Sequence, residues 1–245
     1  MFDLISDFPY HQGIEALLLL GILVTLEAVL SADNAIALAS IAQGLQDSKL
    51  QRQALNIGLL VAYVLRMLLI LTATWVTQYW QFEVLGAAYL LWLVWQYFTS
   101  GNDEEGEKHG PKFENLWQAI PMIALTDLAF SLDSVTTAIA VSKDTWLVLT
   151  GATIGIIALR FMAGLFIRWL DEFVHLADAG YFAIAIVGLR LLVRAINEEF
   201  VPPEWLMITT IALIFLWGFS KRVEIESKPE EIETPVPAEK QESLR

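Results

Sequence analysis

Cysteine is absent from this 245-residue sequence. Its absence excludes disulfide bonds, and it also excludes the thiolate ligands that zinc, copper and iron–sulfur centres favour. Basic residues are scarce, because 15 Lys and Arg stand against 28 Asp and Glu and give a net charge of −13. Much of this charge falls in two polar segments, 101–115 and 221–245, so it says little about the partners of the remaining chain.

Features of enzymes and secreted proteins are also missing. The sequence offers no nucleophile with an accompanying general base and no nucleotide-binding loop, so we do not expect an enzyme. His11 and His175 are isolated along the chain, which does not favour a histidine metal site. The first apolar run has no basic segment before it and no small-residue cleavage site after it, so we expect it to remain in the mature protein.

Long apolar runs dominate what is present. Hydrophobic residues make up 56% of the sequence, well above their share in a soluble domain. Runs such as IGLLVAYVLRMLLILTATWV approach or reach the roughly 20 apolar residues that cross a bilayer. We predict an all-α polytopic membrane protein with seven transmembrane helices, at about residues 14–42, 55–77, 82–98, 116–142, 146–168, 180–196 and 203–220.

The distribution of basic residues predicts the orientation of these spans. One set of connections carries Lys49, Arg52, Lys108, Lys112, Arg168, Lys221 and Arg222, whereas the other offers mainly Lys143. By the positive-inside rule, the N-terminus is outside and the C-terminus is cytoplasmic. The expected location is the cell (inner) membrane.

An internal repeat relates the first three spans to the next three. EAVLSADN at residues 27–34 is matched by DLAFSLDS at 127–134, Arg66 by Arg160, and Gln96 by Arg190. Because each unit has an odd number of spans, the second must be inverted relative to the first. The predicted regions are a first three-helix repeat (1–98), a cytoplasmic polar loop (99–115), a second inverted repeat (116–196), a seventh helix (197–220) and a disordered acidic cytoplasmic tail (221–245).

The repeated motif places four carboxylates near the middle of spans one and four: Glu27, Asp33, Asp127 and Asp133. A charged side chain at the bilayer centre costs about 2.5–3.5 kcal/mol, so these residues need partners. An inverted repeat would bring both pairs together at the midplane. The same segments supply further oxygen atoms, from Asn34, Ser31, Ser131 and Ser134.

Helix geometry separates the two acids within a motif. On a regular helix Ser31 and Asn34 lie within about 40° of Glu27, whereas Asp33 is displaced by about 120° and by about 9 Å along the axis. Either the helix loosens near Ser31, or the two acids serve different layers of a pathway. Discontinuous helices of this kind form transporter sites, and Pro121 offers a point at which span four could break.

A site made only of oxygen atoms suits hard cations such as Mn²⁺, Mg²⁺ and Ca²⁺. Metal and protons would compete for the carboxylates, which offers a route to cation/proton exchange. Three arginines, Arg66, Arg160 and Arg190, are predicted to balance the acids, and their release of the acids in one conformation is the alternative role. Arg194 is predicted to snorkel to the membrane interface. An ion-pair cluster that only fixes helix packing is the competing interpretation of the four acids.

The stretches LEAVLSADNAIALA and ALTDLAFSLDSVTTAIAV, with the two arginine neighbourhoods, resemble the TerC family of integral membrane proteins over about residues 14–220. The resemblance implies a transporter fold and, for several members, export of Mn²⁺. It also implies a metal pathway formed by Glu27, Asp33, Asn34, Asp127 and Asp133, with Ser31, Ser131 and Ser134 as neighbours. Gln96 departs from the basic residue expected at its position.

The resulting hypothesis is a transporter that exports a divalent cation, most favourably Mn²⁺, through an oxygen-ligand site between two inverted repeats, with proton exchange as an option. The alternatives are transport of Ca²⁺ or another cation, and a non-transporting membrane scaffold or assembly factor. The expected partners are the cation and the lipid bilayer; homo-oligomerisation stays open, and neither nucleic acid nor a resident cofactor is expected.

Overall fold

The computed structural model describes residues 9–99 and 113–223, and these segments are helical apart from turns, short connections and one isolated bridge between Phe173 and Arg222. The prediction of an all-α protein is therefore confirmed. Residues 100–112 and 224–245, which hold most of the predicted polar loop and acidic tail, lie outside the described residues.

The helices follow the predicted spans closely. In chain order they are α1 (Pro9–Leu30), α2 (Ala32–Gln43), α3 (Ser48–Val76), α4 (Trp80–Thr99), α5 (Leu116–Val141), α6 (Thr145–Glu172), α7 (Leu176–Ile196), the 3-10 turn η2 (Glu198–Phe200) and α8 (Glu204–Gly218). Within the described residues, α3, α5, α6 and α7 are long and apolar enough to cross a membrane.

One helix begins well before its apolar run. α3 starts at Ser48, seven residues before the predicted start of span two at residue 55. The Asp47 side chain caps this helix by accepting a hydrogen bond from the Lys49 backbone N–H at 2.8 Å. Hydropathy marks only the apolar part of a helix, whereas the cap sets where the helix begins.

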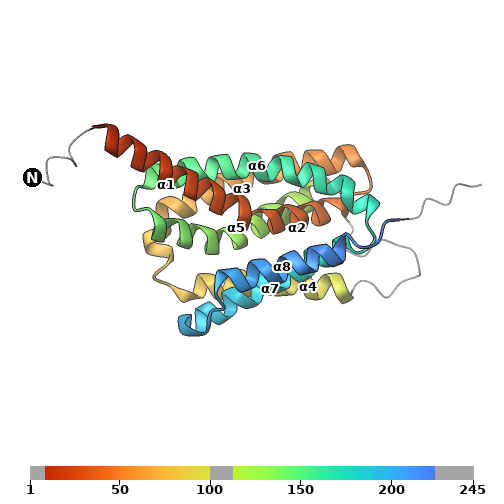
Figure 1. The fold of residues 1–245 in the computed structure, drawn as a ribbon. Coiled ribbons are helices and arrows are strands. Elements are labelled where there is room, and N and C mark those ends of the chain that lie inside the picture. The colour runs from red at the N-terminus through yellow and green to blue at the C-terminus, as the bar shows by residue number, and fades with distance from the viewer. Residues whose placement is uncertain (1–8, 100–112, 224–245) are drawn as a thin grey trace, which may run out of the picture.

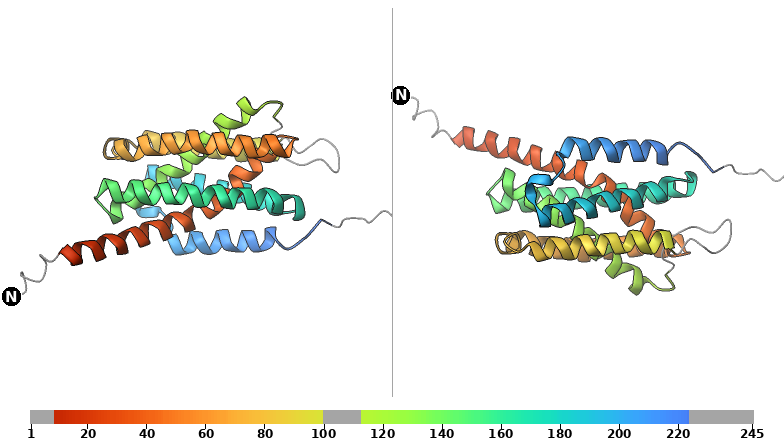
Figure 2. Two further views of the ribbon diagram at one scale, coloured as in Figure 1. Left: turned by 90° about the horizontal axis from the view of Figure 1, so that it is seen from above. Right: turned by 90° about the horizontal axis from the view of Figure 1, so that it is seen from below.

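The helices lie roughly along one common axis, and the connections between them alternate between the two ends of the bundle (Figure 1). α3 packs against α5, and α6 packs against α1 and α2. α4 and α7 form a second close pair, to which α8 adds on the α7 side. Figure 2 shows the same bundle from two further directions, with α8 on its outside.

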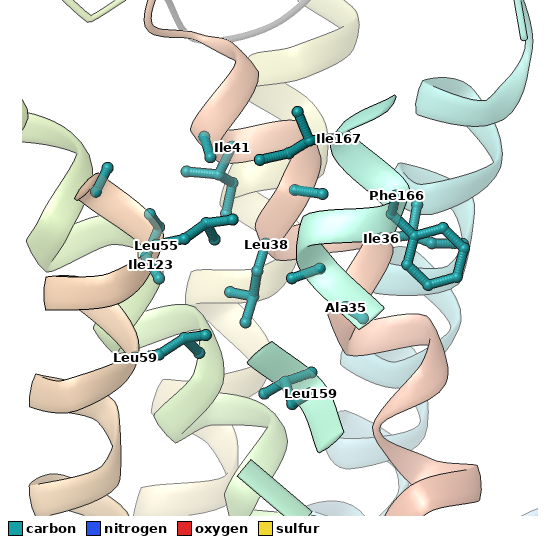
Figure 3. Packing of buried hydrophobic residues seen from close by; sticks show 14 of the residues in the cluster. Ala35, Ile36, Leu38, Ile41, Leu55, Leu59, Ile123, Leu159, Phe166 and Ile167 are labelled. Carbon is teal, nitrogen blue, oxygen red and sulfur yellow. The ribbon is translucent and has the colours of Figure 1, made fainter. Parts of the chain in front are cut away.

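A cluster of buried apolar side chains joins α2, α3, α5 and α6 (Figure 3). Leu38 and Ile41 of α2 belong to it, together with Leu55 of α3, Ile123 of α5 and Leu159 of α6. Close approach of α3 and α5 depends on Gly58, where an added Cβ would lie 2.7 Å from Ile123 Cγ2. The cluster fixes the four helices that carry or flank the repeated motifs.

We call one end of the bundle the basic end, because five exposed cations lie there: Lys49, Arg52, Arg168, Lys221 and Arg222. Side chains and backbone tie this end together. The Gln43 amide donates to Asp171 Oδ1 at 3.1 Å, and the Val223 N–H donates to the Glu172 carbonyl at 2.8 Å. The end of α2, the end of α6 and the segment after α8 therefore meet at one end.

A buried aromatic pair joins α4 to α7 near the same end. The rings of Tyr97 and Tyr181 are stacked, with centroids 3.7 Å apart, and both side chains are buried. The Tyr97 hydroxyl donates to Asp178 Oδ1 at 2.6 Å. This charge-assisted hydrogen bond links the last turn of α4 to the first turn of α7.

Candidate functional site

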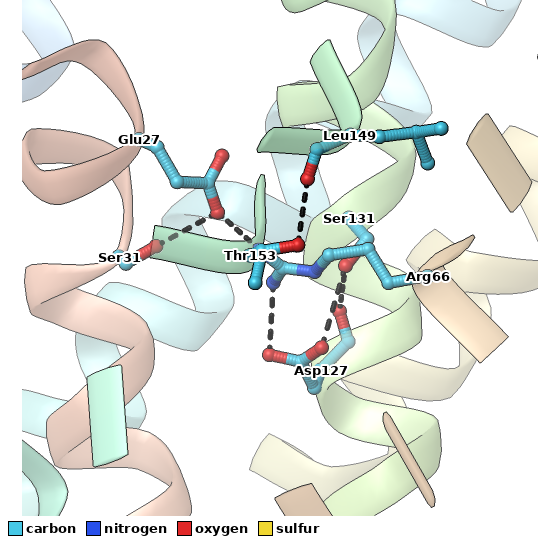
Figure 4. Close-up of polar contacts among 7 residues, drawn as sticks. All are labelled: Glu27, Ser31, Arg66, Asp127, Ser131, Leu149 and Thr153. Atoms are coloured by element: carbon cyan, nitrogen blue, oxygen red, sulfur yellow. Dashed lines mark hydrogen bonds and ion pairs between the residues drawn. The ribbon is translucent and has the colours of Figure 1, made fainter. Parts of the chain in front are cut away.

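Arg66 of α3 lies between two carboxylates that come from different repeats of the sequence (Figure 4). Its Nη1 donates to Glu27 Oε1 of α1, and its Nη2 donates to Asp127 Oδ1 of α5 at 2.9 Å. All three residues are buried, Arg66 and Asp127 almost completely. Two carboxylates against one guanidinium leave this cluster with a formal charge of −1.

Each of these acids also contacts the serine one helical turn later. Ser31 Oγ donates to Glu27 Oε1 at 3.1 Å. Ser131 Oγ donates to the Asp127 carbonyl oxygen at 2.7 Å and lies 3.4 Å from Asp127 Oδ2. The repeated spacing of acid and serine therefore has a repeated role, which is to hold the acid from the following turn.

The backbone differs between the two motifs. At Ser31 the first span is divided, because α1 ends at Leu30 and α2 begins at Ala32. Loosening here is one of the two alternatives that the wheel positions of the motif residues left open. α5 is instead one continuous helix with Pro121 inside it, so the predicted break in span four is wrong. Pro121 lies in the second turn of α5, where losing one backbone hydrogen bond does not end the helix.

Asp133 forms a second cluster, separate from the first. It accepts hydrogen bonds from Arg190 and, at 2.9 Å, from Arg194 Nη1, both on α7. Arg194 Nε also lies 3.4 Å from Glu83 Oε1 of α4. Two carboxylates and two guanidiniums make this cluster formally neutral, and it joins α4, α5 and α7.

Arg194 and Glu83 were not among the site residues predicted from the sequence. Arg194 lies in the last turn of α7, is 19% exposed and pairs with two acids, and this pairing was not predicted. The signal that could have found it is its spacing from Arg190, because residues four apart share one face of a helix. Hydropathy gives the depth of such a residue but not the direction in which it points.

Arg160 lies apart from both clusters, although it matches Arg66 in the repeat. Its Nε donates to Asn56 Oδ1 of α3 at 2.5 Å. Within the described residues it forms no ion pair with a motif acid. The Asp33 side chain lies outside the described ones, so the charge-balancing role of Arg160 stays a prediction.

The other predicted residues fall around the first cluster. Asn34 and Ser134 are buried, and Ser134 lines a small cavity together with Glu27 and Arg66. Asp33 belongs to α2, but its side chain lies outside the described ones. Across the described part of the chain, no group of three or more His, Asp or Glu side chains is gathered as a metal site, because arginines hold the acids.

Comparison with known proteins identifies the family. The integral membrane protein TerC family matches residues 12–225, which includes both motifs and nearly every described helix. The chain belongs to the TerC family. The resemblance predicted from the two acidic motifs is thus confirmed, and with it a membrane protein surrounded by a lipid bilayer.

Relatives of this TerC protein are membrane proteins from bacteria and a plant. The uncharacterized membrane protein YceF of Bacillus subtilis is 37% identical over 189 residues, which cover 74% of this chain and 73% of that protein. The inner membrane protein YgdQ of Escherichia coli K12 is 28% identical, covering 69% and 75%. The thylakoid membrane protein TERC of Arabidopsis thaliana is 25% identical, covering 58% and 44%. No solved structure matches the chain.

Proposed function

We propose that this TerC protein exports a divalent metal cation, Mn²⁺ in the first instance, from the cytoplasm. The observation that carries the proposal is the buried Glu27–Arg66–Asp127 cluster with its formal charge of −1. An excess carboxylate inside a membrane protein is costly unless a cation or a proton neutralises it. Carboxylate, hydroxyl and amide oxygens are the ligands of hard divalent cations.

Arg66 has two roles in this proposal. In the described conformation its guanidinium occupies the space between Glu27 and Asp127 and neutralises part of their charge. A divalent cation entering from the adjacent cavity competes for the same oxygen atoms, so binding requires Arg66 to move away. Ser31 and Ser131 contact the two acids, and Ser134 lines the cavity. With the buried Asn34 they are the proposed supporting ligands, and Asp33 and Asp133 are proposed to extend the pathway.

An inverted repeat would supply the alternating access that export needs. The packing supports this proposal: when α1–α2 is exchanged with α5, α3 with α6, and α4 with α7, the close pairs among these helices become one another or stay the same. α3 on α5 becomes α6 on α1–α2, and α4 on α5 becomes α7 on α2. On this basis we propose seven crossings of the inner membrane of the cell. The basic end then lies in the cytoplasm, as the positive-inside rule predicts.

The test is cellular Mn²⁺ content in a strain that lacks its own exporters. The parent is expected to lower the internal Mn²⁺, whereas Glu27→Gln and Asp127→Asn are expected to lose this effect at equal membrane abundance. Glu15→Gln is the matched control, because Glu15 also lies on α1 but is exposed. Equal Mn²⁺ content with the parent and the empty vector would reject Mn²⁺ export and favour another cation or the scaffold function.

Proton exchange is proposed as the driving step, because protons and Mn²⁺ would compete for Glu27 and Asp127. With purified protein in sealed vesicles, Mn²⁺ entry should make the lumen more alkaline, and Mn²⁺ exit should make it more acidic. Mn²⁺ flux that is unaffected by collapsing the pH gradient with an ionophore would remove this part of the proposal.

A further inference from the structure

Arg160 carries a charge that the transport proposal does not use. It lies in the middle of α6, and its only described hydrogen bond goes to the uncharged amide of Asn56 on α3. Its Nη1 lies 3.0 Å from the point where a Cβ of Gly164 would be, so the missing side chain of Gly164 gives the guanidinium room. Gly164 is one turn nearer the basic end, so the side chain points towards that end.

Apolar side chains that face away from the bundle surround this pair. Ile57 and Leu60 of α3 are 41% and 63% exposed, and Ile157 of α6 is 52% exposed. In a membrane this surface faces lipid tails, where an unneutralised arginine is unfavourable. An anion at the same surface would remove that cost.

The basic end supplies a route for such an anion. Arg52 precedes Asn56 by four residues on the same exposed face of α3, which is about 6 Å along the axis. Arg168 follows Arg160 by eight residues on α6 and is also exposed. Asn56, which holds the guanidinium of Arg160, therefore lies about one turn from Arg52, and Arg168 lies about 12 Å further along α6, nearer the lipid headgroups.

We propose that Arg160, Asn56 and Arg52 form a binding site for the phosphate of an anionic phospholipid, on the outer face of α3 and α6. Guanidinium groups bind phosphate oxygens through paired hydrogen bonds, and basic pockets between membrane helices bind lipid headgroups. The acyl chains lie over Ile57, Leu60 and Ile157. This site is independent of cation transport, and it gives Arg160 a role different from that of its repeat partner Arg66.

The test is native mass spectrometry of the full chain titrated with phosphatidylglycerol and, separately, with phosphatidylcholine. One cation near a membrane surface contributes about 1 kcal/mol of lipid binding, or roughly a five-fold change in affinity. Arg160→Gln is expected to weaken phosphatidylglycerol binding by about that factor or more, with little effect on phosphatidylcholine. Arg222→Gln is the matched control, because it removes one exposed cation from the same end but lies over Phe173. Equal losses in the two variants would mean unspecific attraction and overturn the site.

Two further variants keep the charge of Arg160 and test its placement. Asn56→Leu removes the amide that holds the guanidinium, and Gly164→Ala places a methyl group 3.0 Å from Nη1. Both are expected to weaken phosphatidylglycerol binding while circular dichroism and the elution volume stay unchanged. Unaltered binding in both variants would overturn the site even if Arg160→Gln failed to fold.

A second copy of the chain and free phosphate are the competing occupants. A dimer in the parent that dissociates in Arg160→Gln without added lipid would show that a protein contact covers Arg160, and would overturn the lipid site. Displacement of phosphatidylglycerol by equimolar inorganic phosphate would do the same, because acyl-chain contacts give the lipid an advantage that free phosphate lacks.

Discussion

Adding one methyl group at Gly155 tests whether Glu27 lies where the structure places it. A Cβ at Gly155 of α6 would lie 2.1 Å from Glu27 Cγ, 3.1 Å from Cδ and 3.2 Å from Cβ. Carbon atoms in contact are about 3.5–4.0 Å apart, so a shift of about 1.4 Å or more is required. Glu27 cannot make it freely, because its carboxylate is bound to Arg66 and Ser31.

The size of the effect follows from three contributions. Overpacking of a buried site costs about 1–3 kcal/mol. Removing glycine from a helix returns about 1 kcal/mol. If α1 keeps its place and Glu27 leaves Arg66, the broken buried ion pair adds about 3–5 kcal/mol. Gly155→Ala is therefore expected to destabilise the protein by about 0–2 kcal/mol if Glu27 keeps Arg66 and by about 3–7 kcal/mol if it leaves. Each kcal/mol lowers Tm by about 2–4 °C for a chain of this length.

Two glycines of the same helix pair serve as graded controls. A Cβ at Gly151 would lie 3.2 Å from Leu23 Cβ, whereas at Gly21 it meets nothing within 4 Å. In thermal unfolding of the purified variants, Gly151→Ala is expected near the parent Tm and Gly21→Ala at or above it. Mn²⁺ export should fall only in Gly155→Ala. An equal Tm for the alanine variants at 155 and 21 would refute the packing of α6 on Glu27.

Three further changes test the remaining contacts. Asp133→Asn should destabilise the protein by about 3–5 kcal/mol in thermal unfolding, because the guanidiniums of Arg190 and Arg194 lose their shared carboxylate. Adding Arg194→Gln should recover part of this stability, and no recovery would contradict the neutral cluster. Tyr97→Phe should lower stability by about 1.5–3 kcal/mol through the lost hydrogen bond to Asp178, and an unchanged Tm would reject that bond. Arg66→Gln should keep Mn²⁺ bound to the purified protein but slow its release, so equal release rates would argue against the displacement step.

The sequence predicted the helices well because their apolar runs and polar connections are long and regular. The motif spacing also predicted that Glu27 and Asp33 would not point the same way on a regular helix, and the division at Ser31 is the structural counterpart. In the second motif the same reasoning separates Asp127 from Asp133, which lie in different clusters. These features depend on local periodicity, which one sequence contains.

The partners of the charged residues could not be predicted in the same way. Arg66 and Arg160 occupy matching positions in similar sequences, yet Arg66 reaches two acids and Arg160 reaches Asn56. Which way an arginine points depends on the rotation of its helix against its neighbours. That rotation is set by contacts such as Gly58 with Ile123, between residues far apart in the sequence. Glu83 was missed for the same reason, because its partner Arg194 lies on another helix.

The two clusters differ most in how their acids are neutralised. Glu27 and Asp127 share one arginine. Asp133 instead pairs with two arginines, one of which also pairs with Glu83. Under the proposed export function, the first cluster is where a divalent cation gains most, because negative charge is in excess there. In the first repeat the position that matches Arg190 holds Gln96, which is uncharged and whose buried Oε1 accepts no hydrogen bond within the described residues. In the proposed transporter, Gln96 therefore leaves the first repeat without the charge that Arg190 gives the second, and this makes the two repeats electrically different.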